Sequence, residues 1–349
     1  MVRNLISAML LVVAALFAGA FLLPTEVHVQ RSITIDRPPA TVFAVLNGYH
    51  LFDQWSPWAR RDPGARFETS GPDRGVGARL SWEGDPQLVG SGYQQITLSQ
   101  PYRRIETTLD FGEQGEAEAY FDLEPAADGV RVTWGFDTDV TAGRGFIDGL
   151  IGRYLGLFFD RWIGSDYEQG LRALKALAES MPNADFSDLD VRRVDVVPEP
   201  ALLVTGAEGG APGDVSAALA AAFARIGEFM ARRGLAHSGQ PLAITRSTGS
   251  GGYRYDAAIP ADTAGVTGEG EVHVGTTPGG PAVRAVHVGP YDNLAETYDK
   301  LGAYLAAQGL TPGAVSWERY VSDPADTPSH ALVTHVFYAI SEDEGEGGG

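Results

Sequence analysis

The chain of 349 residues contains no cysteine, which excludes disulfide bonds, thiolate metal ligands and cysteine nucleophiles. Basic residues are also few. There are 26 Lys and Arg against 45 Asp and Glu, which gives a formal net charge of -19. Proteins bind nucleic acid largely through Lys and Arg that neutralise phosphates, so we expect no nucleic-acid partner.

Motifs for metals and phosphates are missing as well. The seven histidines form no i, i+4 pair with an accompanying acidic ligand. The glycine-rich segments lack the following Lys-Ser or Lys-Thr of a phosphate-binding loop, and no Gly-x-Ser-x-Gly elbow occurs. We therefore expect neither a metal nor a cofactor.

One long segment without charge is present, from Leu5 to Leu23, between Arg3 and Pro24. A helix of this length crosses the core of a bilayer. Ala18-Gly19-Ala20 also suits cleavage of a signal peptide, which is the alternative. Because the apolar run continues past that site, we expect residues 1–24 to be a single-pass membrane anchor. Arg3 would stay inside, which places the following domains outside the cytoplasm.

The length of the chain allows two domains. In the first, Val27 to Ile35 alternates apolar and polar residues as a half-buried strand does, and Pro38-Pro39 opens a short helix. Several strand-like runs follow up to Phe136, and a helical stretch from Phe146 to Glu179 closes the region. An antiparallel sheet that grips a helix is expected, within an α+β chain.

This arrangement, with Ser56-Pro57-Trp58, Trp134 and the segment Tyr167 to Leu177, resembles the SRPBCC superfamily, also called START-like or polyketide cyclase-like. The resemblance covers residues 27–179. It implies a deep, largely apolar cavity between the sheet and the closing helix, suited to a lipid or another hydrophobic small molecule. It implies no particular reaction.

Two tryptophans of this region are candidates for ligand contact. Trp55 and Trp58 are expected to pack against the core and close one end of the sheet. Contact with a ligand is the alternative for both.

Residues 180–190 are short, acidic and contain Met-Pro-Asn, which predicts a linker between domains. Residues 342–349 are rich in Glu and Gly with nothing apolar, which predicts a disordered tail.

Residues 191–341 contain an internal repeat at an offset of 75 residues. Each copy is expected to form a strand, an amphipathic helix and two further strands, so that the domain is a pseudo-twofold duplication. The same offset pairs Ala243 with Glu318, so only one copy carries a charge at this position. The matching residues are Leu219, Phe223, Ile226, Gly227, Met230, Gly234 and Leu235 with Leu294, Tyr298, Leu301, Gly302, Leu305, Gly309 and Leu310.

This block resembles the GyrI-like, or effector-binding, domain of multidrug-sensing regulators, over about Val191 to Ile340, and the second copy is the more specific part. The residues that carry the resemblance are His287 to Tyr291, Trp317 to Tyr320, Asp323-Pro324 and the closing strand Val333 to Ile340. The chain departs from the family in this closing strand. His335 stands where an acidic residue is usual, and Phe337-Tyr338 replaces the usual Pro.

Glu318 is the central candidate, because the resemblance places a Glu at this motif position in the ligand pocket. Strand alternation puts Glu318 and Tyr320 on one face and Trp317 on the other. If the apolar face packs on the helices, Glu318 faces the groove between the copies. A cationic aromatic ligand would pair with the carboxylate there. Ring contacts could come from Tyr291, Tyr298, Trp317 or Tyr320.

The alternative for Glu318 is a solvent-exposed strand end, with the carboxylate paired to Arg319 or another surface charge. A catalytic role is a further alternative, because a desolvated carboxylate is a competent base near neutral pH.

The sequence thus predicts a membrane-anchored protein that binds, sequesters or senses hydrophobic or cationic amphiphilic small molecules. It contains no helix-turn-helix segment that would couple ligand binding to transcription, and it does not identify a protein partner. Two alternatives remain: a small-molecule hydrolase that uses Glu318, and a non-catalytic scaffold of the cell envelope.

Overall fold

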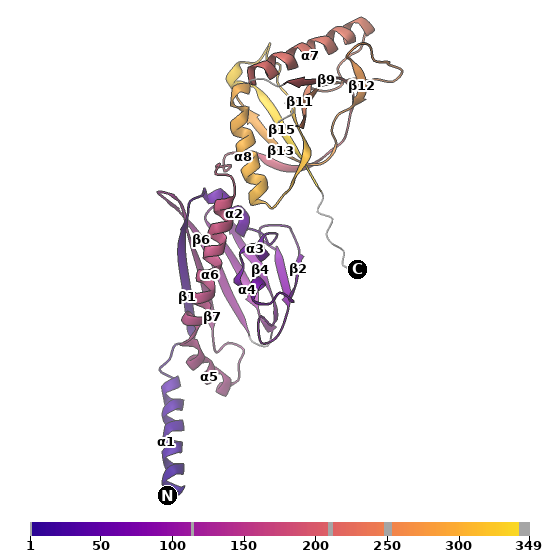
Figure 1. Ribbon diagram of the computed structural model, residues 1–349. Helices are drawn as coiled ribbons and strands as arrows, with labels where there is room; N and C mark the ends of the chain where they lie inside the picture. The colour runs from indigo at the N-terminus through magenta and orange to yellow at the C-terminus, as the bar shows by residue number, and fades with distance from the viewer. Residues whose placement is uncertain (1, 113–114, 209–211, 248–252, 342–349) are drawn as a thin grey trace. The chain divides into compact units, whose positions relative to one another are not determined.

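The computed structural model describes residues 2–112, 115–208, 212–247 and 253–341, and the chain divides into two compact units at Asp185 and Phe186 (Figure 1). The tail expected at residues 342–349 lies outside the described residues. The prediction of an α+β chain with antiparallel sheets is confirmed, since the units contain one sheet of seven strands and one of eight.

The first unit is built on an antiparallel sheet in the order β1-β7-β6-β5-β4-β3-β2. Its strands alternate buried and exposed positions, so one face supplies the core. In β5 and β6 the alternation is regular, which leaves one side of each strand buried. The strands are β1 (Glu26–Ile35), β2 (Arg66–Ser70), β3 (Arg79–Glu83), β4 (Ser91–Gln100), β5 (Arg104–Asp110), β6 (Glu116–Ala126) and β7 (Gly129–Asp139).

Helix α6 (Phe159–Ser180) packs along the sheet beside β1 and buries Tyr167, Leu171 and Leu174 (Figure 1). Short helices α2 (Pro39–Leu46), α3 (Phe52–Trp55) and α4 (Pro57–Arg61) contact it or the neighbouring strands. The Ser56 side chain caps α4 by accepting a hydrogen bond from the Trp58 amide, and Pro57 occupies the first helical position.

The single closing helix expected from Phe146 to Glu179 is wrong in one respect. The structure divides it into α5 (Phe146–Gly156) and α6, with the break at Leu157 and Phe158. The two segments bury different faces against different partners. Gly152 of α5 lies against the backbone of Val140, whereas α6 packs its apolar stripe on the sheet.

Trp134 in β7 is the centre of the aromatic core. Its ring stacks on Tyr167 of α6 with centroids 3.9 Å apart and on Phe121 of β6 with centroids 4.9 Å apart. Trp55 and Trp58 meet its edges, each at 5.5 Å. The helices are therefore fixed to the sheet through one ring, as aromatic edge and face contacts allow.

Helix α1 (Val2–Ala20) ends before the uncharged segment does, so Phe21, Leu22 and Leu23 lie outside it. The uncharged helical part, residues 5–20, is about 24 Å long at 1.5 Å per residue, whereas a bilayer core is about 30 Å thick. Within the described residues, no helix is both long enough and apolar enough to span a membrane. The membrane-spanning anchor expected from the sequence is therefore not found.

The second unit is built on an antiparallel sheet in the order β12-β9-β11-β10-β14-β15-β13-β8. Two long helices, α7 (Pro212–Arg233) and α8 (Leu294–Ala307), accompany it. Short strands β8 and β12 were not anticipated. The strands are β8 (Val191–Val196), β9 (Pro200–Glu208), β10 (Leu242–Ser247), β11 (Tyr253–Pro260), β12 (His273–Thr276), β13 (Gly280–Val288), β14 (Pro312–Tyr320) and β15 (Val333–Ile340).

The two halves of this sheet repeat each other. Read outward from the central β10–β14 pair, one half continues with β11 and β9 and the other with β15 and β13. The helices also end alike. Gly234 and Gly309 have φ of 66° and 64°, the left-handed conformation that favours glycine after a helix. The next amides, of Leu235 and Leu310, bond back to helical carbonyls at 3.0 and 2.9 Å.

Candidate ligand sites

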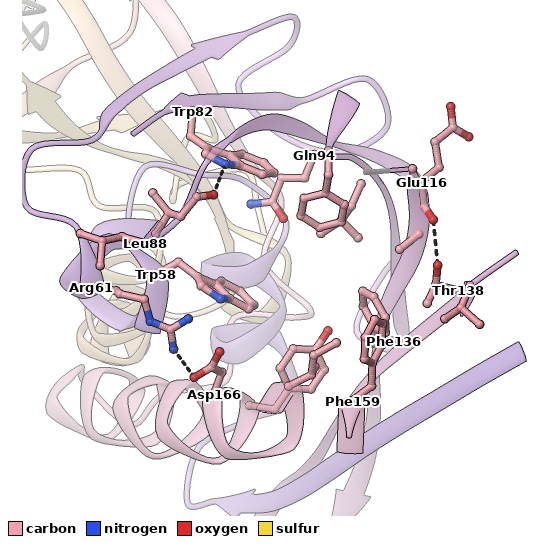
Figure 2. A pocket seen from close by; sticks show the side chains of 18 of the residues that line it. Trp58, Arg61, Trp82, Leu88, Gln94, Glu116, Phe136, Thr138, Phe159 and Asp166 are labelled. Atoms are coloured by element: carbon pink, nitrogen blue, oxygen red, sulfur yellow. Dashed lines mark hydrogen bonds and ion pairs between the residues drawn. The ribbon is translucent and has the colours of Figure 1, made fainter. Parts of the chain in front are cut away.

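The first unit contains a cavity of about 330 Å³ between six strands of the sheet and helices α3, α4 and α6 (Figure 2). The cavity thus lies between the sheet and the closing helix, where the resemblance placed it. Most of its lining is apolar. Its aromatic lining residues are Phe52, Trp58, Phe67, Trp82, Phe111, Phe136, Phe159 and Tyr167.

Two pairs of polar groups lie on opposite sides of the cavity (Figure 2). On one side Arg61 of α4 forms an ion pair with Asp166 of α6, whose side chain is only 14% exposed. On the other, the Thr138 hydroxyl donates a 2.9 Å hydrogen bond to the backbone carbonyl of Glu116. Sequence reasoning missed Arg61 and Asp166, because nothing in the sequence joins residues 105 positions apart. The helical period of α6 does place Asp166 next to the cavity-lining Tyr167.

A small second cavity of about 20 Å³ adjoins the first, and Phe52, Trp58 and Tyr167 line both. Trp55 and Tyr49 line only the smaller one. No described residue forms a hydrogen bond with the buried Trp55 Nε1 or with the Tyr49 hydroxyl. The structure thus brings Trp58 to the main cavity, whereas Trp55 lies in the core with one unused donor at the smaller cavity.

In the second unit, Glu318 of β14 lies among tyrosines. The hydroxyl of Tyr298 on α8 donates to its Oε1 at 2.9 Å, and the hydroxyl of Tyr320 donates to its Oε2 at 2.8 Å. Both oxygens of the carboxylate are therefore engaged. The structure thus brings Glu318, Tyr298 and Tyr320, all selected from the sequence, into direct contact.

Burial raises the pKa of Glu318, although the side chain keeps some exposure to solvent. The hydrogen bonds from Tyr320 and Tyr298 act in the opposite direction, because they stabilise the charged form. Burial first, and then the charge of Glu318, raises the pKa of Tyr298 and Tyr320 well above the ordinary value. All three groups are thus held in a desolvated setting.

Further rings surround this carboxylate. Tyr291, which is 36% exposed, meets the ring of Tyr320 edge-on at 5.3 Å, and Phe223 of α7 does so at 5.9 Å. Burial raises the pKa of Tyr253, and the charge of Glu318 raises it further, which places this tyrosine in the same electrostatic environment. Sequence reasoning missed Phe223 and Tyr253 as site residues, although Phe223 belongs to the internal repeat.

Trp317 is not part of this group. It is 1% exposed and stacks on Phe337 at 4.8 Å, in an apolar cluster formed by strand residues alone. The sequence correctly separated the two faces of β14. The helices instead cover the Glu318 face, to which they contribute Tyr298 and Phe223.

Arg319 does not pair with Glu318, since consecutive strand residues point to opposite faces. Its guanidinium instead donates to Glu199 at 2.6 Å. His287 supports the loop that carries Tyr291: its Nε2 donates to the carbonyl of Pro290 at 3.1 Å, and its Nδ1 lies 2.8 Å from the Thr297 hydroxyl.

Within the described part of the chain, no three His, Asp or Glu side chains are grouped to hold a metal ion.

A family model described as polyketide cyclase/dehydrase and lipid transport matches residues 26–179, and one described as GyrI-like small molecule binding domain matches residues 195–341. A search of curated proteins found no match.

Several solved structures are similar to parts of the chain. A hydrolase from Listeria innocua is 15% identical, with a TM-score of 0.32, over 43% of this chain and 91% of that one. EcmrR in a complex with DNA is 13% identical, with a TM-score of 0.40, over 56% of this chain and 72% of that one. Ara h 8.0201 is 13% identical, with a TM-score of 0.32, over 44% of this chain and 99% of that one. Likenesses this weak carry no argument about function. The family matches do assign both regions: the chain joins a polyketide cyclase (SRPBCC) domain, residues 26–179, to a GyrI-like small-molecule-binding domain, residues 195–341.

Proposed function

We propose that the protein binds small amphiphilic molecules without changing them chemically. Apolar ligands occupy the cavity of the first unit. Organic cations bind in the second unit at the Glu318 group, which consists of Glu318, Tyr298, Tyr320, Tyr291 and Phe223. The cavity of about 330 Å³ with its aromatic lining is the observation that carries the proposal.

The cavity suits a ligand with a long apolar part. Ligand pockets commonly measure roughly 300–1,000 Å³ and combine an apolar lining with a few polar groups. Here the polar groups include the Arg61–Asp166 pair, Gln94 and Thr138. An apolar ligand gains about 25 cal/mol for each Å² that it removes from water. A polar group of the ligand would lie near Arg61, which supplies several N–H donors.

The Glu318 group suits a cation with an aromatic or alkyl body. Desolvation disfavours the charged carboxylate, and its hydrogen bonds within the described chain come from two tyrosine hydroxyls rather than from a basic side chain. A bound cation would offset this cost and restore the ionised form. The rings of Tyr291, Tyr320 and Phe223 could offer a face for a cation–π contact.

The geometry supports binding better than hydrolysis at Glu318. A general base must reach the proton that it removes, but both carboxylate oxygens already accept hydrogen bonds from tyrosine hydroxyls. One acceptor site on each oxygen is thus already occupied, and the rings around Glu318 supply contacts for a bound cation. The scaffold alternative predicts no ligand at all.

The test is native mass spectrometry of the purified full chain, followed by titration with two probes, an apolar fluorescent dye and benzyltrimethylammonium. Ala117→Phe fills space in the cavity and should weaken only the dye, because Ala117 lines that cavity. Glu318→Gln should weaken only the cation. If each variant bound its matched probe as tightly as the natural chain does, the proposal would be contradicted. Turnover of reactive esters or epoxides that Glu318→Gln abolishes would contradict it as well.

A location outside the cytoplasm is a separate part of the proposal. It rests on the uncharged segment from Leu5 to Leu23 and on Arg3. Cell fractionation together with N-terminal sequencing of the mature protein tests it.

A further inference from the structure

Helix α5 presents its large apolar side chains, except the buried Leu150, to solvent and its glycines to the body of the first unit. A Cβ atom at Gly152 would lie 2.3 Å from the carbonyl oxygen of Val140, and one at Gly156 would lie 2.9 Å from Cγ2 of Val27. The glycine side is therefore in close contact. The other side is exposed, with Phe146 at 64% and Ile151 at 52%. Surface helices normally bury such residues.

The exposed surface continues into the first turns of α6. We call it the α5 face and define it by Phe146, Ile147, Ile151, Leu155, Phe158 and Trp162, all of which are more than two-fifths exposed. Contiguous apolar surface of this kind marks a site of interaction with a protein or a membrane.

Helix α1 adjoins this face. Phe17 and Phe21 contact the ring of Phe146 at 5.8 and 6.3 Å, and the Tyr154 hydroxyl donates to the carbonyl of Leu16 at 2.7 Å. In α1 the consecutive residues 10–13 are all apolar and are between 56% and 72% exposed. Successive residues of a helix point about 100° apart, so these side chains face every direction.

Because these side chains are exposed on all sides of α1, lipid fits this surface better than a protein partner does. A protein groove covers one stripe of a helix, whereas acyl chains can surround it. Within the described residues no helix is long and apolar enough to cross a membrane, so the docking proposed below involves no membrane span. Trp162 on the α5 face belongs to the residue type that prefers the boundary between lipid and water.

The α5 face is also continuous with the cavity. Phe159 and Ile163 line the cavity, and the residues directly before them, Phe158 and Trp162, belong to the α5 face. Cavity-lining residues and exposed apolar residues are thus direct neighbours at the start of α6. Acyl chains against this turn would lie beside the cavity.

We propose that the α5 face docks on the surface of a phospholipid bilayer, with α1 lying in the same interface. The docking does not depend on which ligand the cavity holds. The net charge of -19 opposes attraction to a strongly anionic surface, so a zwitterionic bilayer is the matching probe.

The chain has no cysteine, so one label can be placed at a chosen position. The full chain carrying Ile151→Cys, labelled with an environment-sensitive dye, is mixed with phosphatidylcholine vesicles. Val288→Cys is the control, because Val288 is 63% exposed in the second unit. The dye at 151 should shift to the blue and be quenched by brominated acyl chains, and the dye at 288 should change in neither respect.

A second variant tests the energetics. Ile147→Ser with Ile151→Ser should weaken vesicle binding roughly tenfold or more, because two exposed apolar side chains lose their burial. Val197→Ser with Val288→Ser, at positions 77% and 63% exposed, should not. Three results would overturn the proposal: no vesicle binding, vesicle binding with the dye at 151 still in water, or a blue shift that needs no vesicles and grows with protein concentration. The last would indicate a second copy of the chain.

Discussion

Ala243 and Glu318 lie directly opposite each other in the central strand pair β10–β14. They are also equivalent positions of the internal repeat, because 318 − 243 = 75. The neighbouring pairs, Leu242 with Arg319 and Ile244 with Trp317, follow the same register. The local axis that relates the two copies therefore passes between a methyl group and a carboxylate, and the duplicated unit has a single charge at its centre.

A second carboxylate at this axis should be costly. Directly opposite residues share a face with Cβ atoms about 5 Å apart, and Ala243 is only 2% exposed. We expect Ala243→Glu to lower the free energy of unfolding at pH 7 by about 1–3 kcal/mol more than Ala243→Gln, which has the same size without the charge. Urea unfolding of both variants measures this.

The difference between these two variants should depend on pH. A paired carboxyl has a folded pKa above its unfolded one, so its stability is full below the unfolded pKa and is lost as pH rises through the folded pKa. The variants should therefore become alike as pH falls below about 4. An equal loss for Glu and Gln at every pH would show that packing, not charge, is responsible.

The sequence located this central position but not its surroundings. The 75-residue offset and strand alternation were enough to place Glu318 and Tyr320 on one face, because both are properties of neighbouring residues. Alternation does not say which layer covers a face, so the sequence predicted a ligand contact for Trp317, whereas its ring stacks on Phe337 in the core. Nor does it reveal tertiary pairs such as Arg61 with Asp166, which only the packing of α4 on α6 brings together.

Replacing Glu318 should separate binding from folding. In Glu318→Gln the amide can still accept from one tyrosine hydroxyl and donate to the other, so the fold should persist. Affinity for benzyltrimethylammonium should fall by about 2 kcal/mol or more, roughly thirtyfold, because the cation would lose its desolvated counter-charge. Calorimetric titration measures the change, and Glu199→Gln, at a carboxylate that pairs with Arg319, serves as the control.

Glu318→Gln should weaken cation binding without lowering the stability of the unliganded protein. Burial raises the folded pKa of Glu318 above its unfolded value, so its contribution is full below the unfolded pKa and is lost as pH rises through the folded pKa. Above that range Glu318→Gln should be at least as stable as the natural chain, and near pH 4 the advantage should vanish. A variant that is less stable at pH 8 than at pH 4, relative to the natural chain, would contradict this sign.

The Arg61–Asp166 ion pair beside the cavity should contribute to stability mainly because Asp166 is largely buried. Arg61 is 40% exposed and Asp166 only 14%, so Arg61→Met leaves a largely buried carboxylate unpaired. We expect a loss of about 1 kcal/mol for this change, and less for Arg61→Met combined with Asp166→Leu, because the double change removes both charges. A double-mutant cycle by urea unfolding gives the coupling, and strictly additive losses would show that the two groups act independently.

A pair of helical glycines tests how tightly the first unit is packed. A Cβ atom at Gly170 in α6 would lie 2.6 Å from Cζ3 of Trp134 and 3.1 Å from Cδ of Pro57, whereas one at Gly227 in α7 would have nothing within 4 Å. Trp134 has little room to move, because Tyr167 is stacked on it at 3.9 Å. Gly170→Ala should therefore destabilise the first unit by about 1–3 kcal/mol.

Gly227→Ala is the matched control and should stabilise the second unit by about 0.5–1 kcal/mol, since alanine reduces the freedom of the unfolded chain and no neighbour must shift. Differential scanning calorimetry of the full chain resolves the two changes if each unit has its own transition. If Gly170→Ala were as stabilising as Gly227→Ala, the stack of Trp134 on Tyr167 would have to yield to a methyl group. The aromatic end of the cavity would then be able to change shape for a ligand.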